Sequence, residues 1–345
     1  MSTVVAPIAD VAQLDDLLSE PSAGAVATLG RLAGDLMLLG VGGKMGPTLA
    51  RMARRASDAA GTRRRIIGVS RFSSGPLEGQ LRDQGVETIR CDLLDQAQLD
   101  RLPDVPNVLF MTGMKFGSTG NEAMTWAMNA YLPGMVCQKF RQSRIVAFST
   151  GNVYGLTPVV RGGSLESDPL NPVGEYALSC LGRERIFEHF SRTLGIPMAL
   201  LRLNYATELR YGVLVDVARA VWEGQPIDLA MGNLNAIWQA DANAMALCAF
   251  DHLASPPRVL NLAGPELLSV RRIAEQFGAL LNKPVTFRGA EQPEALLSNG
   301  QLGHRLMGYP RIGVRQMVEW IADWVRRGGA SLGKPTHFEV RDGTY

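Results

Sequence analysis

Residues 35–50 read Asp-Leu-Met-Leu-Leu-Gly-Val-Gly-Gly-Lys-Met-Gly-Pro-Thr-Leu-Ala. The four apolar residues 36–39 suit a strand buried on both faces of a parallel sheet, although so short a run also suits a buried helix. Gly40, Gly43 and Gly46 follow at a spacing of three, which permits a sharp turn and a close approach of the backbone to a pyrophosphate. The next residue is a proline, which suits the first turn of a helix whose free N–H groups offer an anion site. The stretch predicts strand, phosphate-binding turn and helix, against the alternative of an ordinary glycine-rich turn.

A phosphate-binding loop of the nucleoside triphosphatase kind is the rival interpretation of the same glycines. Gly43-Lys44 resembles the end of that motif. Met45, however, stands where the motif needs a Ser or Thr to bind magnesium. The sequence therefore favours a dinucleotide over a nucleoside triphosphate.

The composition is that of an ordinary globular protein. The chain has 345 residues, of which 46% are hydrophobic and 20% charged, and 35 Lys and Arg against 33 Asp and Glu leave a formal charge of +2. So small a net charge argues against a nucleic-acid partner. No apolar run approaches the roughly 20 residues that span a bilayer, so we expect no membrane insertion.

The cysteines and histidines show no metal-ligand spacing, and we predict no metal site. Because the N-terminus lacks the pattern of a secretion signal, we expect a cytoplasmic protein with four free thiols. These thiols belong to Cys91, Cys137, Cys180 and Cys248.

Strands and helices are expected to alternate along the first half of the chain. Residues 1–34 are predicted to form a helical N-terminal extension, with apolar side chains on one face. Further strands are expected at residues 65–70, 85–91, 107–111 and 144–148, and a helix at 121–141. This alternation predicts an α/β fold with a doubly wound parallel sheet, the Rossmann arrangement, and helices on both faces.

Ser70 and Arg71 end the second predicted strand, where a dinucleotide fold places the adenosine ribose. An acidic residue there would accept hydrogen bonds from both ribose hydroxyls, whereas Ser and Arg would donate to a 2′-phosphate. We therefore predict NADP as cofactor, with NAD as the alternative. The other interpretation of Arg71 is a solvent-facing side chain after a strand.

Two later segments carry a resemblance to a known family. Thr150 precedes Gly-Asn-Val-Tyr-Gly, and Tyr176 lies in Gly-Glu-Tyr-Ala-Leu-Ser-Cys at residues 174–180. With the glycine turn, these segments resemble an extended short-chain dehydrogenase/reductase of the NAD-dependent epimerase/dehydratase type, with a fold like that of UDP-galactose 4-epimerase. The resemblance covers roughly residues 35–327.

Other motifs extend the resemblance. Asp92-Leu93 matches the family's adenine-contacting pair, and Tyr176 falls at the usual distance beyond Thr150 for the catalytic tyrosine. Residues 201–205 resemble Arg-x-x-Asn-Val-Tyr, residues 237–242 resemble Ile-His-Val-x-Asp-Val, and residues 261–273 match a strand, turn and helix entry of the substrate domain.

The resemblance implies two domains and a set of site residues. It implies a Rossmann domain mainly in residues 35–200, a smaller α/β substrate domain mainly in 201–330 with interleaved segments, and a tail at 331–345. The cofactor-binding residues that it and the glycine turn indicate are Gly40, Gly43, Lys44, Met45, Gly46, Ser70, Arg71, Asp92, Leu93, Thr112, Gly113, Lys115, Tyr176 and Asn204. The indicated substrate-binding residues are Thr150, Asn152, Asn204 and Trp238, and the indicated catalytic positions are Thr150, Tyr176, Cys180 and Lys115.

A homodimer is also implied. In the family the helices at residues 121–141 and 174–194 pair across a two-fold axis into a four-helix bundle. The apolar residues that could supply that surface, or could belong to the core instead, are Met124, Met128, Tyr131, Met135, Phe187 and Phe190.

Cys180 departs from the family pattern, because lysine stands there in the family, one helical turn after the tyrosine. That lysine binds the nicotinamide ribose and lowers the pKa of the tyrosine, and a neutral thiol does neither. In one interpretation Lys115 replaces it in a working enzyme; in another the chain is a nucleotide-binding sensor or scaffold. Two alternatives remain: the lysine was replaced by cysteine through engineering, or Cys180 acts as a catalytic thiolate.

The expected reaction is oxidation and reduction, or epimerisation, at a carbonyl or alcohol carbon, with Tyr176 as acid and base. Asn235-Ala236 stands where family members that handle nucleotide sugars usually have an arginine. Trp238 and Gln239 also replace smaller or imidazole residues. We therefore expect a smaller polyol, sugar or keto compound.

Overall fold

A seven-stranded sheet forms the centre of the computed structural model, which describes residues 7–73, 75–115, 117 and 119–344. Its order is β12-β7-β5-β4-β1-β2-β3, and every neighbouring pair is parallel. The strands are β1 (Leu36–Leu39), β2 (Ile66–Ser70), β3 (Glu87–Arg90), β4 (Asn107–Phe110), β5 (Arg144–Thr150), β7 (Met198–Leu203) and β12 (Arg258–Leu262). The predicted doubly wound sheet is confirmed, because the order reverses direction between β1 and β4.

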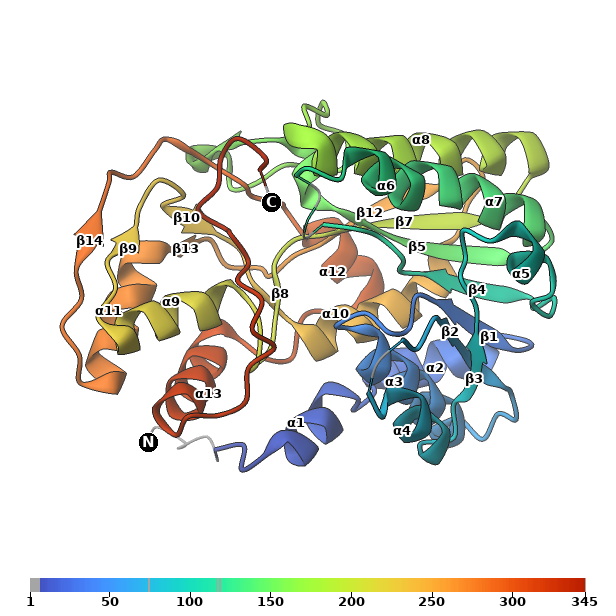
Figure 1. Ribbon diagram of the computed structural model, residues 1–345, viewed down its shortest axis with the longest axis horizontal. Helices are drawn as coiled ribbons and strands as arrows, with labels where there is room; N and C mark the ends of the chain where they lie inside the picture. The colour runs from blue at the N-terminus through green and yellow to red at the C-terminus, as the bar shows by residue number, and fades with distance from the viewer. Residues whose placement is uncertain (1–6, 74, 116, 118, 345) are drawn as a thin grey trace.

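The alternation of side chains along β1 explains why helices cover both faces. Leu36 and Leu38 belong to one buried cluster, whereas Met37 and Leu39 belong to another. Helices α6, α7 and α8 lie above the sheet and α2, α3 and α10 below it in Figure 1. The Rossmann helices are α2 (Ala23–Arg31), α3 (Gly46–Ala59), α4 (Leu77–Asp83), α5 (Gln96–Asp100), α6 (Glu122–Trp126), α7 (Leu132–Lys139), α8 (Gly174–Leu194) and α10 (Gln239–Cys248).

The helix predicted at residues 121–141 is broken by a π-helical turn, η1 (Ala127–Tyr131), between α6 and α7. Pro133 has no N–H to donate to the carbonyl of Asn129 four residues earlier. That carbonyl instead accepts a hydrogen bond from Arg183 Nε at 3.3 Å. The missing backbone hydrogen bond and this side-chain contact account for the widened turn.

Two residues named for the dimer surface belong to the core instead. Phe187 is fully buried and packs edge-on against Phe110, with ring centroids 5.3 Å apart. Met135 is 5% exposed. Both side chains fill the layer between the sheet and its covering helices, so neither reaches the surface.

A second, smaller α/β layer lies on the left in Figure 1. It is built on α9 (Val213–Glu223), α11 (Val270–Leu281) and α13 (Val314–Arg326), which pack against one another. The short strands pair as β9 (Ile227–Asp228) with β14 (Phe287–Arg288), β10 (Asn233–Leu234) with β13 (Leu268–Ser269), β8 (Ala206–Thr207) with β11 (Ile237–Trp238), and β6 (Thr157–Pro158) with β15 (Glu294–Ala295). Short helices η2 (Gly151–Tyr154), η3 (Val159–Arg161), η4 (Ala249–His252) and α12 (Gln301–Met307) complete the chain.

Strand β12 corrects one expectation. Residues 261–264 were expected to begin a strand of the substrate domain. Instead β12 pairs in parallel with β7 at the edge of the central sheet. The sheet therefore takes strands from beyond residue 200, and the two layers are interleaved in sequence.

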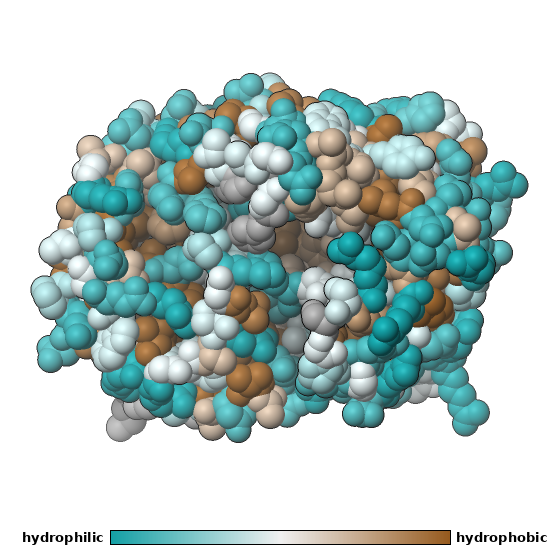
Figure 2. Space-filling model, viewed as in Figure 1, coloured by the Kyte–Doolittle hydropathy of each residue, from teal (hydrophilic) through white to brown (hydrophobic). Residues whose placement is uncertain are grey.

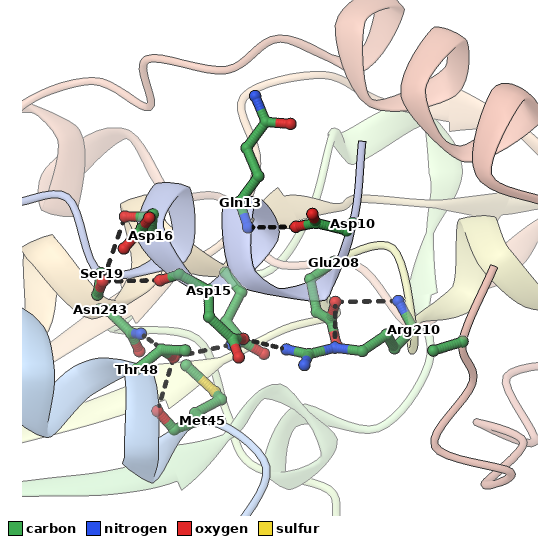
Figure 3. Close-up of polar contacts among 12 residues, drawn as sticks. Asp10, Gln13, Asp15, Asp16, Ser19, Met45, Thr48, Glu208, Arg210 and Asn243 are labelled. Carbon is green, nitrogen blue, oxygen red and sulfur yellow. Dashed lines mark hydrogen bonds and ion pairs between the residues drawn. The ribbon is translucent and has the colours of Figure 1, made fainter. Parts of the chain in front are cut away.

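The described part of the N-terminal extension predicted over residues 1–34 is helical in α1 (Val11–Leu18) and in α2, and both helices pack against α3 and α10. Figure 3 shows how it is tied to the second layer: Arg210 lies between Asp15 of α1 and Glu208. Among the helices of the described residues, none combines the length and the apolar character needed to cross a bilayer. The four cysteines are buried and form no disulfide.

Candidate cofactor and active site

The glycine turn after β1 is shaped by contacts that exclude larger side chains. Gly40 has φ 91°, and a Cβ there would lie 2.6 Å from Thr112 Oγ1. A Cβ on Gly46 would lie 2.2 Å from the carbonyl oxygen of Val41. Helix α3 begins at Gly46, with a proline at the start of the helix. The free N–H groups of the helix N-terminus therefore lie next to the glycine turn.

A cleft of about 600 Å³, here called the glycine cleft, runs from this turn along the carboxyl ends of the neighbouring strands. The predicted cofactor residues that line it are Gly40, Gly43, Ser70, Arg71, Asp92, Leu93, Thr112 and Gly113. Thr112 Oγ1 is buried without a hydrogen-bond partner among the described residues. A glycine-lined cradle, a helix N-terminus and an unsatisfied hydroxyl fit the sugar and phosphate groups of a dinucleotide.

A smaller pocket of about 150 Å³, here called the tyrosine pocket, is lined in part by Lys44 and Lys115, the residues that directly follow Gly43 and Met114 of the glycine cleft in sequence. The predicted residues that line it are Lys44, Met45, Lys115, Thr150, Asn152, Tyr176 and Asn204. Residues not foreseen there include Tyr211, Gln239 and Thr336. The fold thus brings together the end of β5, the first turn of α8 and the segment after β4.

Tyr176 is hydrogen bonded to Thr150 and to Cys180. Thr150 Oγ1 also donates to Asn152 Oδ1 at 3.0 Å and accepts from the backbone N–H of Asn152 at 3.2 Å. Burial raises the pKa of Tyr176 well above its ordinary value, and the positive charge of Arg183 opposes that effect. Burial likewise raises the pKa of the Cys180 thiol, which argues against the thiolate interpretation of this residue.

Two lysines reach the tyrosine pocket from the cofactor side. Lys115 Nζ lies 5.8 Å from the ring centroid of Tyr176 and donates to the carbonyl oxygen of Thr336 at 3.5 Å. Lys44 Nζ lies 3.1 Å from the ring centroid of Tyr211. Burial lowers the pKa of Lys115 to about 8. It lowers the pKa of Lys44 to about 7, assisted by the charges of Lys115 and Lys334.

Arg183 is a buried cation that the sequence reasoning missed. Its Nη1 donates to the carbonyl oxygen of Phe148 at 3.0 Å, and its Nη2 donates to Asn129 Oδ1 at 2.6 Å. A Cβ on Gly113 would lie 2.5 Å from Nη2, so the guanidinium lies directly beneath the glycine cleft. The available signal was its position on α8, two helical turns after Tyr176 and so on the same face.

Trp238 does not reach the tyrosine pocket, which corrects its predicted role in binding substrate. Its side chain is 1% exposed and packs against Trp320, with ring centroids 5.5 Å apart. Gln239, the next residue, lines the pocket instead and donates to Thr48 Oγ1 at 3.2 Å. Trp238 ends β11 and Gln239 begins α10, and at this junction of strand and helix the two neighbouring side chains lie in different surroundings.

Solved structures with this fold include nucleotide-sugar enzymes. UDP-glucuronic acid 4-epimerase from Bacillus cereus, in complex with UDP-glucuronic acid and NAD, is 17% identical with a TM-score of 0.70, covering 85% of this chain and 99% of that one. dTDP-glucose 4,6-dehydratase from Bacillus anthracis, in complex with NAD, is 15% identical with a TM-score of 0.71, covering 86% and 97%. UDP-glucose 4-epimerase from Thermus thermophilus, in complex with NAD, is 18% identical with a TM-score of 0.69, covering 85% and 99%.

At these identities the structural likeness establishes the fold alone. A search of curated protein sequences finds no match. The family model of the NAD dependent epimerase/dehydratase family, a family of enzymes, matches residues 36–238, which is more than half of the chain. Together with the parallel sheet, the glycine turn and the buried tyrosine, this match shows that the chain belongs to the NAD dependent epimerase/dehydratase family.

Proposed function

We propose that this protein is an NADP-dependent oxidoreductase or epimerase that acts on a carbonyl or alcohol carbon of a small polyol, sugar or keto compound. One observation carries the proposal. Thr150, Tyr176 and Lys115 line a single pocket, which Lys44 and Met45 of the glycine turn also line. A proton-exchanging group, a hydrogen-bond donor and a cation therefore converge beside the cofactor cleft.

The chain's own side chains would manage the proton. When bound, the nicotinamide supplies or accepts the hydride. Tyr176 takes up the proton of the substrate hydroxyl during oxidation and returns it to the oxygen during reduction. Thr150 turns its one hydroxyl hydrogen from Asn152 Oδ1 to that same oxygen, while the backbone N–H of Asn152 still donates to Thr150 Oγ1 and holds the threonine in place.

Lys115 and Arg183 together take the place of the family lysine in this proposal. Burial and the neighbouring Cys180 both raise the pKa of Tyr176, so a nearby positive charge is needed for proton exchange near neutral pH. Lys115 supplies an ammonium over the ring face, and Arg183 a permanently charged guanidinium on the same helix. Two cations beside Cys180 favour a working enzyme over a sensor or scaffold.

NADP is proposed over NAD because of the end of β2. Ser70 and Arg71 both line the glycine cleft there, and Arg71 is exposed. A guanidinium is suited to a 2′-phosphate, whereas the dinucleotide in the Bacillus and Thermus structures is NAD. The cofactor preference therefore rests on Arg71.

A small substrate is proposed because the side chain of Asn235 is used in hydrogen bonds within the fold. Its Nδ2 donates to the carbonyl oxygen of Glu266 at 3.1 Å, and its Oδ1 accepts from the N–H of Ser298 at 3.0 Å. With both ends of its amide engaged and 3% of its surface exposed, the Asn235 side chain is buried in the fold rather than presented to a diphosphate. A nucleotide-sugar epimerase remains the second candidate, because UDP-glucuronic acid is bound in the Bacillus cereus structure.

Cofactor turnover separates these functions. The protein is incubated with NADPH and a panel of small aldehydes, ketones, sugars and nucleotide sugars, while NADPH absorbance and product identity are followed. Net NADPH loss with a carbonyl compound supports a reductase, and a changed sugar at constant NADPH supports an epimerase. Tyr176→Phe is the matched control, since it removes only the phenolic hydroxyl. Nucleotide binding without turnover of any compound would overturn the proposal in favour of a sensor.

A homodimer through the outer face of α6, η1 and α8 is also proposed. Met124 is 45%, Trp126 40%, Tyr131 64% and Leu178 41% exposed, which leaves large apolar side chains at the surface of these helices. Burying such side chains against a second copy is favourable. The four-helix arrangement would use these residues in place of Met135 and Phe187.

A further inference from the structure

Residues 332–344, here called the strap, follow α13 and cross the front of the molecule. The strap is the red segment that rises in Figure 1 from α13 towards the first turn of α8. The backbone N–H of Leu332 donates to the carbonyl oxygen of Arg210 at 3.1 Å. Phe338, near its middle, is 8% exposed and joins the larger hydrophobic core. The strap is therefore seated at its middle, where Thr336 and Phe338 are buried, while residues 332–335 are exposed.

The strap is anchored to both layers of the protein. Arg341 Nη1 donates to the carbonyl oxygens of Ala230 and Glu294, each at 2.8 Å, on the smaller layer. On the Rossmann side Gly343 packs so closely that a Cβ there would lie 2.2 Å from the carbonyl oxygen of Val173, next to the start of α8. The strap thus bridges the opening between the cofactor side and the substrate side.

The strap also supplies one wall of the tyrosine pocket. Thr336 lines that pocket, accepts from Lys115 through its carbonyl oxygen, and donates to Asp216 Oδ2 from its backbone N–H at 2.7 Å and its Oγ1 at 2.6 Å. Figure 2 shows the surface hollowed near the centre of this face, beside the path of the strap. With the strap seated, the pocket measures about 150 Å³.

Lys334 carries a positive charge from the strap to the glycine turn. It lines a cleft of about 380 Å³ together with Gly42, Gly43 and Lys44. The charge of Lys334 contributes to lowering the pKa of Lys44, so the two ammonium groups repel each other in the absence of an anion. A pyrophosphate at the turn would attract both lysines and remove that repulsion.

We propose that the strap closes over the bound dinucleotide and, once closed, leaves room only for a small substrate. Ligand pockets usually measure about 300–1,000 Å³, whereas the closed pocket measures about 150 Å³, half the lower bound. The small size of the closed pocket favours a compound of a few carbons over a nucleoside diphosphate sugar. This inference rests on the proposed function, because it assumes that the glycine cleft holds the cofactor.

Limited digestion tests the closing step. Chymotrypsin cleavage after Phe338 requires the strap to lift, and mass spectrometry reports its rate with and without NADPH. We expect NADPH to slow cleavage at least tenfold in the wild type. Gly343→Ala should lose most of this protection, because its Cβ meets the carbonyl of Val173. Gly333→Ala is the matched control, since Gly333 shares the left-handed backbone, at φ 62°, but has nothing within 4 Å of the added carbon.

Ligand binding tests the size limit. Calorimetry on the NADPH-loaded protein should show UDP-glucose binding at least tenfold more tightly to Gly343→Ala than to the wild type or to Gly333→Ala. Equal affinities in all three proteins, or cleavage after Phe338 that NADPH leaves unchanged, would overturn the strap proposal. If Gly343→Ala stays as protected as the wild type, Thr336→Val/Arg341→Ala removes the side-chain anchors instead. Protection in that variant too would identify a fixed wall and refute closure.

The same measurements separate this inference from the proposed function. NADPH affinity is measured first by calorimetry, without any substrate. Absence of NADPH binding would refute both the proposed function and the strap proposal. Binding without protection of Phe338 would sink the strap inference alone.

Discussion

Replacing Lys115 by methionine tests the central electrostatic claim about the tyrosine pocket. The ammonium lies 5.8 Å from the centre of the Tyr176 ring. Taking that separation as the distance between the ammonium and the phenolate charge, an effective dielectric constant of about 20 gives the phenolate about 3 kcal/mol of stabilisation. An energy of that size corresponds to roughly a hundredfold in rate where proton transfer limits turnover. We therefore expect Lys115→Met to lower kcat/KM about a hundredfold at pH 7, with the carbonyl compound that the wild type reduces fastest.

The pH profile distinguishes charge from structure. The pKa of Lys115 is about 8, so the wild type has the ammonium below that pH and loses it as the pH rises through it. The two proteins should therefore converge in rate above about pH 9. A deficit that stays constant from pH 6.5 to 9.5 would mean that Lys115→Met harms the fold of the pocket. Equal rates at pH 7 would refute the claim that Lys115 acts as the cation.

Moving the charge makes the same test in reverse. Cys180 is fully buried and hydrogen bonded to Tyr176, so Lys115→Met/Cys180→Lys returns an ammonium next to Tyr176 from its own helix. We expect this double variant to regain most of the lost rate. Lys115→Met/Cys180→Met is the control, because it adds similar bulk without charge. Identical rates in the two double variants would show that Tyr176 gains nothing from a nearby cation.

Three further outcomes follow from other parts of the structure. Arg71→Ala should weaken the binding of NADP roughly 10- to 100-fold and leave the binding of NAD nearly unchanged, because a charge-assisted contact of about 1.5–3 kcal/mol is lost for NADP only. Equal losses of affinity in titrations with both cofactors would contradict this prediction. The pKa of Lys44 is lowered to about 7, so above that pH the unfolded chain binds more protons than the folded protein. Lys44 should therefore make a contribution to stability that grows from pH 7 to 9. Thermal unfolding of the ligand-free protein should show this contribution, and Lys44→Met should lack it. An unchanged slope in Lys44→Met would argue against it. Light scattering at micromolar concentration should give the mass of a dimer, and Tyr131→Glu should give that of a monomer because it places a charge on the exposed apolar face; a monomeric wild type would refute the dimer.

Local signals in the sequence were enough for the cofactor half of the site. The run at residues 36–39 and the glycines after it specify their own strand, turn and helix, because φ above zero at Gly40 and the contact at Gly46 leave no other residue type. The position of Ser70 and Arg71 at the end of β2 could also be predicted. In a parallel sheet the carboxyl ends of adjacent strands meet, so residues at those ends share a cleft.

Contacts between distant segments could not be read from the sequence. Trp238 has the pattern of a pocket residue, and only its partner Trp320, from another helix, shows that it is core. Phe187 follows Tyr176 on α8, yet its neighbour Phe110 lies on a strand. The apolar face of a helix indicates burial without indicating whether the covering surface belongs to the same chain. The sequence gives no sign of the anchor at Arg341, because its hydrogen bonds go to backbone carbonyls that any sequence would supply.

The order in which the pocket's walls are synthesised has a consequence for the growing chain. Lys115 and Thr336, which meet at the pocket, are 221 positions apart in sequence. At roughly 5–20 residues per second, about 10 to 45 seconds of translation separate the two. During that interval the parallel sheet and glycine turn can already form. A ribosome-bound chain would then have an open cleft next to Tyr176, without the wall that Thr336 later supplies. Nucleotide present during synthesis would then meet this cleft before Thr336 emerges, and cofactor loading can precede completion of the site.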